Sequence, residues 1–447
     1  MVTYCQMLLL HKLQKKVVDL TTKSFTMKKQ ATSNKQQATL KFRFKSLLFP
    51  LFFYMLIPLF SKSQIISNLV WNHVDGISEP YSITKSLTDK QGNTITIATK
   101  VVPSEDANIS VIKFDRSGSI IWQQSYNGIS NAKDYATNLY IDDNYNIFVC
   151  GTSYDSTTLY DMLVLKYDSA GTLEITMQYD GPANGDDIAT AVGLDGGGRI
   201  YVTGSSTVSG NMTDFVTVKY QTDGTFDWEA FYDYANGYEV PIGIEFKHDY
   251  SSMYISGASA SSLTNWDYAT INYDLSGTQL GAVRSSSAGI GFDNPMGFFI
   301  DSLNNIYITG SAIDSGTTTY NIKTMKLDSA LNILWTKTYD EDHMNDQGND
   351  IAVDDYGNVY VTGYVMAGND SSNIAILKYD AAGNLIWCKK FYGKNLKGKG
   401  AWRVHGGGFG GTIQAFVPQD KLGEYVKTLE HVYGKGSCHK LFIRAKG

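Results

Sequence analysis

The sequence has few charged residues, few cysteines and no pattern of catalytic side chains. Charged residues make up 18% of the 447 residues and the formal net charge is −6, so the chain lacks the basic surface that nucleic-acid binding requires. The four cysteines, Cys5, Cys150, Cys388 and Cys438, have neither disulfide nor metal-ligand spacing. Stability must therefore come from packing, and the sequence predicts no catalytic residues.

The sequence does contain a repeated glycine motif. Residues 357–363 read GNVYVTG, and steps of 53 residues back from Gly363 reach further glycines that end similar apolar stretches: Gly310, Gly257, Gly204 and Gly151. Glycine within a strand usually indicates a bulge or a close approach of another backbone. We therefore expect these glycines to lie where the second strand of each unit passes close to a neighbouring backbone.

Three other residue types follow the same period. Aspartate precedes the strand at Asp142, Asp195, Asp301 and Asp354, with His248 in that position of the fourth unit; lysine follows it at Lys113, Lys166, Lys219, Lys326 and Lys378; and tryptophan closes several units at Trp122, Trp228, Trp335 and Trp387. Several columns that share one period indicate a repeat protein.

Each unit reads as four strands. In the last one, residues 349–353, 359–362, 373–379 and 385–392 are strand-like, and turn residues such as those at 354–358 and 380–384 separate them. Four antiparallel strands without helical periodicity predict a propeller blade. The six complete units are residues 79–126, 131–179, 184–232, 236–285, 291–339 and 346–392. A leftover strand at 68–76 leaves two alternatives open, a six-bladed ring with a displaced end or seven blades with one cut short.

The units resemble the beta-propeller repeats of the bacterial SBBP family. The stretch NDIAVDDYGNVYVTGY followed by NIAILKYDAAGNLIW carries the resemblance, which covers about 320 residues. It implies an all-β propeller, an extracytoplasmic location and a binding or scaffolding role, and it transfers no catalytic residues. The fourth unit departs most from the pattern, with His248 for aspartate and Gly281 for tryptophan, so we expect that blade to be irregular.

The first 63 residues are predicted to be a leader and export signal. A basic region at 28–45 precedes an apolar run of about 15 residues at 46–60, and the small residues Ser61 and Ser63 allow cleavage before Gln64. Met27 would begin a more ordinary signal, so the true start is expected there. The alternative of a permanent membrane anchor is disfavoured because the run is short and contains Pro50 and Pro58. The repeats are then residues 64–393.

Residues 397–447 lose the period and read as an α+β fragment. This segment resembles the C-terminus of galactokinase, a GHMP kinase, whose third motif is matched by Gly406, Gly407, Gly408, Phe409, Gly410 and Gly411. The resemblance implies that these glycines would bind ATP with Mg²⁺, yet the family's sugar-binding motif, phosphate loop and catalytic residues are missing upstream. A cytoplasmic kinase tail behind an export signal is physically contradictory, which suggests a chimera that arose in the gene model or the sequence assembly.

Two metal interpretations compete with simpler ones. The acidic and amide clusters at 142–144, 301–305 and 354–355 could bind Ca²⁺, but Asp and Asn are also favoured in hairpin turns, and we prefer that interpretation. Cys438 and His439 with His405 and His431 do not have a zinc-ligand spacing. The sequence therefore predicts neither a metal nor a cofactor.

The function predicted from these features is that of an exported or cell-surface binding or scaffold module, monomeric and without catalysis. Its ligand, a glycan, peptide or protein, would sit over the central mouth where the blade loops converge. The membrane would be involved only through the export signal. Two alternatives are a galactokinase, supported only by the tail, and a polysaccharide hydrolase or lyase.

Overall fold

The computed structural model describes most of the repeats and parts of both ends. The described residues are 2–6, 81–102, 106–209, 212–262, 265–287, 291–313, 319–367, 371–391, 402–405, 412–416, 423, 426–427 and 438–441. Of the predicted leader and export signal, residues 1–63, only residues 2–6 are described. The predicted strand at 68–76 and the glycine loop at 406–411 lie outside the described residues.

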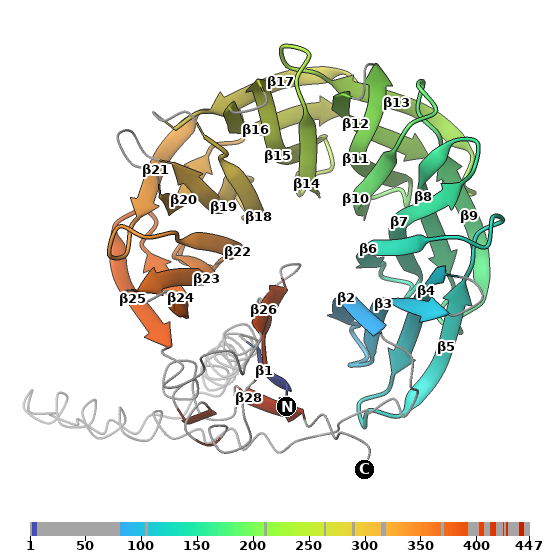
Figure 1. Ribbon diagram of the computed structural model, residues 1–447, viewed down its shortest axis with the longest axis horizontal. Helices are drawn as coiled ribbons and strands as arrows, with labels where there is room; N and C mark the ends of the chain where they lie inside the picture. The colour runs from blue at the N-terminus through green and yellow to red at the C-terminus, as the bar shows by residue number, and fades with distance from the viewer. Residues whose placement is uncertain are drawn as a thin grey trace, which may run out of the picture.

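The repeats form six four-stranded antiparallel sheets, each a meander with its strands in chain order. The sheets are arranged around a common axis as the blades of a propeller, with the first strand of each blade innermost (Figure 1). This confirms the predicted all-β propeller with six blades.

Blades 1 to 3 consist of β2 (Tyr81–Thr88), β3 (Thr94–Val102), β4 (Asp106–Phe114) and β5 (Ile120–Tyr126); β6 (Asp134–Ile141), β7 (Ile147–Asp155), β8 (Leu159–Tyr167) and β9 (Leu173–Tyr179); and β10 (Asp187–Leu194), β11 (Ile200–Ser209), β12 (Met212–Tyr220) and β13 (Phe226–Tyr232). Blades 4 to 6 consist of β14 (Glu239–Phe246), β15 (Ser252–Ser262), β16 (Asn265–Asp274) and β17 (Gln279–Ser285); β18 (Asn294–Ile300), β19 (Ile306–Ile313), β20 (Tyr320–Leu327) and β21 (Ile333–Tyr339); and β22 (Gln347–Val353), β23 (Val359–Ala367), β24 (Ser371–Tyr379) and β25 (Leu385–Phe391).

The hydrophobic core lies between successive blades. Ile95 and Ile97 of blade 1, for example, share one buried cluster with Leu139, Ile147 and Val149 of blade 2. Equivalent clusters occupy the four following junctions. The central strands of blades 2 to 5 are apolar on both faces because another blade covers each side, as radial stacking requires.

The repeated glycines fit a close backbone approach, as predicted. A Cβ added to Gly363 in β23 would lie 1.9 Å from the carbonyl oxygen of Gln347 in β22, where the pairing register shifts between Gly348 and Asp350. A Cβ added to any of four other glycines would likewise lie 2.0 to 2.3 Å from a carbonyl oxygen of the innermost strand of the same blade; these are Gly151, Gly204, Gly257 and Gly310. Glycine recurs at this position because the bulge in the neighbouring inner strand leaves no space for a side chain.

The aspartate column makes hairpin turns. Asp354 Oδ1 accepts hydrogen bonds from the backbone N–H groups of Tyr356 (3.0 Å) and Asn358 (2.8 Å), and its Oδ2 accepts from Asn358 Nδ2 at 2.8 Å. Asp142 and Asp301 are bonded in the same way. These carboxylates are satisfied within their turns, which supports the turn interpretation over the calcium one.

The tryptophan column links neighbouring blades near the rim. The indole N–H of Trp122 donates to the carbonyl oxygen of Ser169 in the next blade at 3.2 Å. Trp228 of blade 3 and Trp335 of blade 5 make the equivalent bonds, of 3.3 Å and 3.2 Å, each to the blade that follows. Blade 4 has Gly281 at this position but keeps the same four strands, so the expected irregularity of that blade was wrong.

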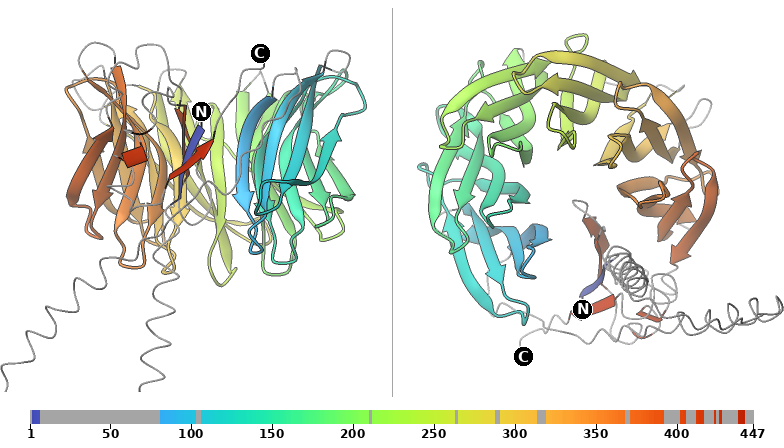
Figure 2. Two further views of the ribbon diagram at one scale, coloured as in Figure 1. Left: turned by 90° about the horizontal axis from the view of Figure 1, so that it is seen from below. Right: turned by 180° about the vertical axis from the view of Figure 1, so that it is seen from behind.

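A seventh four-stranded sheet combines both ends of the chain. It has the order β26 (Trp402–His405), β27 (Thr412–Phe416), β1 (Val2–Gln6) and β28 (Cys438–Leu441). Figures 1 and 2 show it between blade 6 and blade 1, and β26 contacts β22. Between β27 and β28 the structure describes three helical residues, 423, 426 and 427, so the described tail contains both strand and helix. Within the described residues, no helix has the length and apolar character needed to cross a membrane.

Candidate functional site

A pocket of about 540 Å³ opens where the inner strands of blades 4, 5 and 6 begin. It is lined by Val240 and Ile242 of β14, Ala258, Trp266, Phe292, Asp293, Asn294, Ser311, Tyr320, Asn345, Asp346, Gln347 and Tyr364. Its size is within the range of small-molecule and cofactor sites. The pocket lies at one mouth of the ring, where the sequence predicted ligand binding.

A row of three aromatic rings reaches the blade 4 side of the pocket, which is lined by two of them, Trp266 and Phe292. The ring centroids of Tyr238 and Trp266 are 6.3 Å apart with an interplanar angle of 20°, and those of Trp266 and Phe292 are 6.0 Å apart with an angle of 30°. A parallel β-bridge between Trp266 and Phe292 fixes the last pair through the backbone. Phe292 is 46% exposed, so the row presents an apolar surface to solvent.

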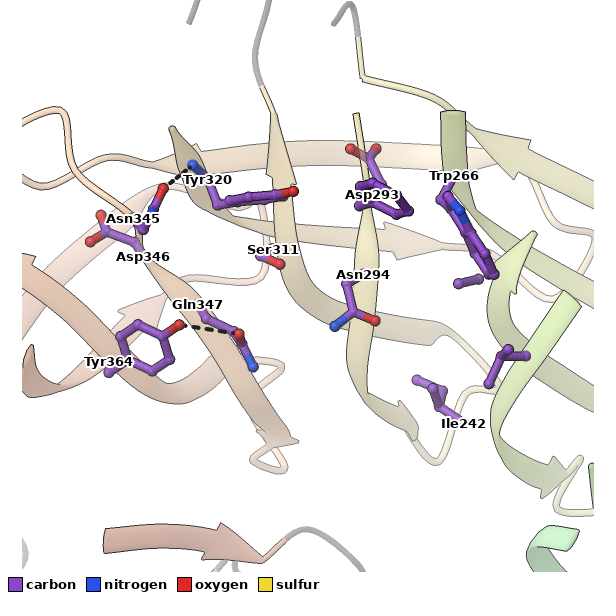
Figure 3. Close-up of a pocket in the computed structure, with 13 residues that line it drawn as sticks. Ile242, Trp266, Asp293, Asn294, Ser311, Tyr320, Asn345, Asp346, Gln347 and Tyr364 are labelled. Atoms are coloured by element: carbon purple, nitrogen blue, oxygen red, sulfur yellow. Dashed lines mark hydrogen bonds between the residues drawn. The ribbon is translucent and has the colours of Figure 1, made fainter. Parts of the chain in front are cut away.

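Amides and tyrosines occupy the remaining wall. Figure 3 shows Trp266 and Tyr364 on opposite sides of the pocket, with the side chains of Asn294 and Gln347 between them. Tyr364 Oη donates to Gln347 Oε1 at 3.3 Å, and Asn345 Oδ1 accepts from the backbone N–H of Tyr320 at 2.9 Å. These contacts hold the side chains in place, and the amides of Asn294 and Gln347 can still exchange hydrogen bonds with a ligand.

The two carboxylates that line the pocket already accept hydrogen bonds from other parts of the protein. Asp346 accepts hydrogen bonds from the backbone N–H groups of Glu341 (2.6 Å) and Met366 (3.0 Å). Asp293 accepts from Lys323 Nζ at 3.0 Å and from the backbone N–H of Ser287 at 3.1 Å. Both carboxylates therefore anchor the link between one blade and the next.

The same position is acidic in five blades, and the sequence reasoning missed it. Asp134, Asp187, Glu239, Asp293 and Asp346 stand at or just before the first residue of an inner strand, 52 to 54 residues apart. All five are buried. The signal was present in the sequence, but the irregular spacing and the change to glutamate hid it.

The buried carboxyl group of Asp346 should make the stability of the protein depend on pH. Burial raises its pKa to about 7, although the two backbone donors act in the opposite direction. An acid whose pKa is higher in the folded state stabilises the fold fully below its ordinary pKa, and that contribution is lost as the pH rises through 7. The contribution falls over about two pH units, and one pKa unit corresponds to about 1.4 kcal/mol, so we expect Asp346 to account for about 2 to 3 kcal/mol of lost stability between pH 5 and pH 8.

Thermal unfolding at pH 5 and pH 8 measures this effect. Asp346→Asn should reduce the fall in the thermal midpoint between the two pH values. The matched control is Asp328→Asn, because hydrogen bonds lower the pKa of this exposed turn aspartate and its contribution changes only at more acidic pH. A pH slope that is the same in Asp346→Asn and the wild type would contradict the prediction.

Of the residues weighed from sequence as zinc ligands, His431 lies outside the described residues and the other three lie on two separate strands. His405 lies in β26 and Cys438 and His439 in β28, with β27 and β1 between these strands in the sheet. At about 4.8 Å between neighbouring strands, β26 and β28 are about 14 Å apart, too far for one zinc ion. The ATP-binding prediction for Gly406, Gly407, Gly408, Gly410 and Gly411 falls outside the described residues and stays a prediction.

Comparisons with solved structures find other propellers at low similarity. The beta-propeller domain of the Trilobed protease from Pyrococcus furiosus is 9% identical with a TM-score of 0.38, over 70% of this chain and 96% of that one. A PL25 ulvan lyase is 10% identical with a TM-score of 0.45, over 80% and 97%. The gluconolactonase XC5397 from Xanthomonas campestris is 13% identical with a TM-score of 0.36, over 63% and 84%.

Sequence comparisons are more restricted. No curated protein matches the chain. One family model matches, the SBBP beta-propeller repeat, over residues 344–364. These residues contain β22 and the start of β23 with Gly363. The chain therefore carries an SBBP-type beta-propeller repeat in its sixth blade.

Proposed function

We propose that this chain is an exported, extracytoplasmic binding protein that holds a neutral glycan in the pocket of blades 4 to 6 and performs no catalysis. The observation that carries the proposal is the pairing of an aromatic row with amide side chains. Sugar rings have apolar C–H faces that pack on aromatic rings, and their hydroxyl groups exchange hydrogen bonds with amides. The export signal in the sequence supports the location.

The charges of the pocket support a neutral ligand. None of the lining residues is Lys, Arg or His, and the chain carries a net charge of −6, so an anionic polymer would not be attracted. The two lining carboxylates, Asp293 and Asp346, already accept backbone hydrogen bonds. That engagement supports binding over acid–base catalysis, for which a carboxylate must reach the substrate.

Trp266→Ala tests the proposal. We expect at least about a tenfold weaker affinity for a neutral oligosaccharide in isothermal titration calorimetry, because the central ring of the aromatic row is lost and tenfold corresponds to about 1.4 kcal/mol. The matched control is Tyr356→Ala, since this aromatic residue is 71% exposed in the β22–β23 turn and does not line the pocket. Binding of peptides or anionic glycans with no binding of neutral glycans would refute the proposal.

The absence of catalysis is tested separately. The wild-type chain, incubated with the glycan that it binds, should release no cleavage products, and with ATP and galactose it should form no galactose phosphate. Turnover in the second assay would instead favour the galactokinase interpretation of residues 397–447.

A further inference from the structure

We propose that the propeller binds two Ca²⁺ ions, at equivalent positions between blades 2 and 3 and between blades 3 and 4. The first position is formed by Asp161, Asp180 and Asp187, and the second by Asp214, Asp233 and Glu239. In each group one carboxylate oxygen from every residue lies within 4.8 Å of the others. The inference does not depend on glycan binding.

The two groups are copies of one arrangement. Asp161 and Asp214 lie on the third strands β8 and β12, and Asp180 and Asp233 follow the outermost strands β9 and β13. Asp187 and Glu239 begin the inner strands β10 and β14 of the following blade. Each group therefore joins two blades at the mouth of the ring that carries the pocket, and Glu239 precedes the pocket residue Val240.

Both groups contain a buried carboxylate oxygen without a partner. Oδ1 of Asp161, a residue only 8% exposed, has no hydrogen-bond partner in the part of the chain that the structure describes, and the same is true of Oε2 of Glu239, which is 0% exposed. Burying an unpaired carboxylate oxygen is costly, so buried carboxylates are normally paired with a cation or coordinate a metal. Among the described residues no ion pair reaches any of the six carboxylates.

The next blade junction shows how the protein neutralises the same arrangement elsewhere. Asp267 and Asp293 stand at the positions of Asp214 and Glu239, and two cationic side chains accompany them. Arg284 Nη2 lies 2.7 Å from Asp267 Oδ2, and Lys323 Nζ lies 3.0 Å from Asp293 Oδ2.

The two proposed sites lack these cations. The residues equivalent to Arg284 are Gln178 and Phe231, and those equivalent to Lys323 are Val216 and Ala269. A bound divalent cation would supply the positive charge that Arg284 and Lys323 supply at the next junction.

The donor atoms select the metal. All six ligands are carboxylates, and hard cations such as Ca²⁺ prefer oxygen donors, whereas zinc sites use His and Cys. Three carboxylates do not supply all the oxygen ligands that Ca²⁺ takes, so water molecules would complete its coordination. Such sites resemble the weak Ca²⁺ sites of extracellular modules, and we expect a dissociation constant of about 10⁻⁴ M.

Calorimetric titration of Ca²⁺ into the EDTA-treated full chain tests the proposal. We expect about two ions per chain, and a thermal midpoint raised by about 5 to 10 °C at a Ca²⁺ concentration on the order of 100 times the dissociation constant. Asp161→Asn and, separately, Glu239→Gln should each reduce the stoichiometry from two to one. Asp214→Asn provides a second variant of the second site in case Glu239→Gln does not fold.

Asp143→Asn is the control, because this exposed aspartate pairs only with Lys90 on the surface and should leave the stoichiometry at two. A wild-type thermal midpoint unchanged by millimolar Ca²⁺ would overturn the proposal. So would a stoichiometry that stays at two in both the Asp161 and the second-site variants.

Discussion

Gly363→Ala is expected to destabilise the propeller by about 3 kcal/mol or more, a large effect for one methyl group. The added Cβ would lie 1.9 Å from the carbonyl oxygen of Gln347, which belongs to the backbone and cannot rotate away. Either the bulge in β22 must shift or the pairing of β22 with β23 must open. Thermal unfolding should therefore show a clearly lower midpoint.

Gly281→Ala is the matched control for this substitution. Gly281 is also a strand glycine, but the nearest atom that its added Cβ would meet is Leu331 Cδ1 at 3.6 Å, an ordinary van der Waals distance. We expect its midpoint to stay close to that of the wild type, because alanine also reduces the entropy of the unfolded chain. Equal midpoints for the two variants would show that the glycine column does not depend on close backbone approach.

Lys323→Met should cost about 3 to 5 kcal/mol, since it removes one partner of a buried ion pair and leaves the other charge uncompensated. Lys323 and Asp293 have side chains only 3% and 1% exposed. The ammonium group also donates to the carbonyl oxygen of Ser285 at 2.8 Å and lies 4.6 Å from the ring centroid of Tyr268. Methionine fills a similar volume, so the loss should come mainly from charge.

A double-mutant cycle separates charge from packing. Adding Asp293→Asn to Lys323→Met removes the uncompensated carboxylate, so the double variant should be more stable than the sum of the two single effects predicts. The control is Lys90→Met, whose salt bridge to Asp143 is exposed and is expected to contribute little. Additive effects at Lys323 and Asp293 would contradict the assignment of an energetically important buried pair.

Periodic features of the fold were predictable from the sequence because the same local geometry recurs in each blade. Each of three residue types has one structural role that the blades repeat, and it therefore recurs with the period of the sequence. These are the aspartates of the turns, the glycines at the bulges and the tryptophans near the rim. The closing of the ring was not predictable in this way. The sheet of β26, β27, β1 and β28 lies between blades 6 and 1, and these four strands are not copies of a blade.

The candidate sites were less predictable because they depend on departures from the repeat. Trp266 and Phe292 belong to no column, and their stacking results from a bridge between β16 and the segment before β18. Lys323 replaces Ala269 and Val216 of the preceding blades, so one blade neutralises its carboxylates differently from the others. Such single differences have functional meaning only once the blades are superimposed in space.

Binding of a neutral glycan at the mouth of blades 4 to 6 is tested most directly by a structure of the complex. Crystals of the full chain, grown with the tightest-binding neutral oligosaccharide, should show a sugar ring against Trp266 and hydroxyl groups within hydrogen-bond distance of Asn294 and Gln347. A glycan bound at the opposite mouth or on the outer strands, with the pocket between Trp266 and Tyr364 free of sugar, would contradict the claim.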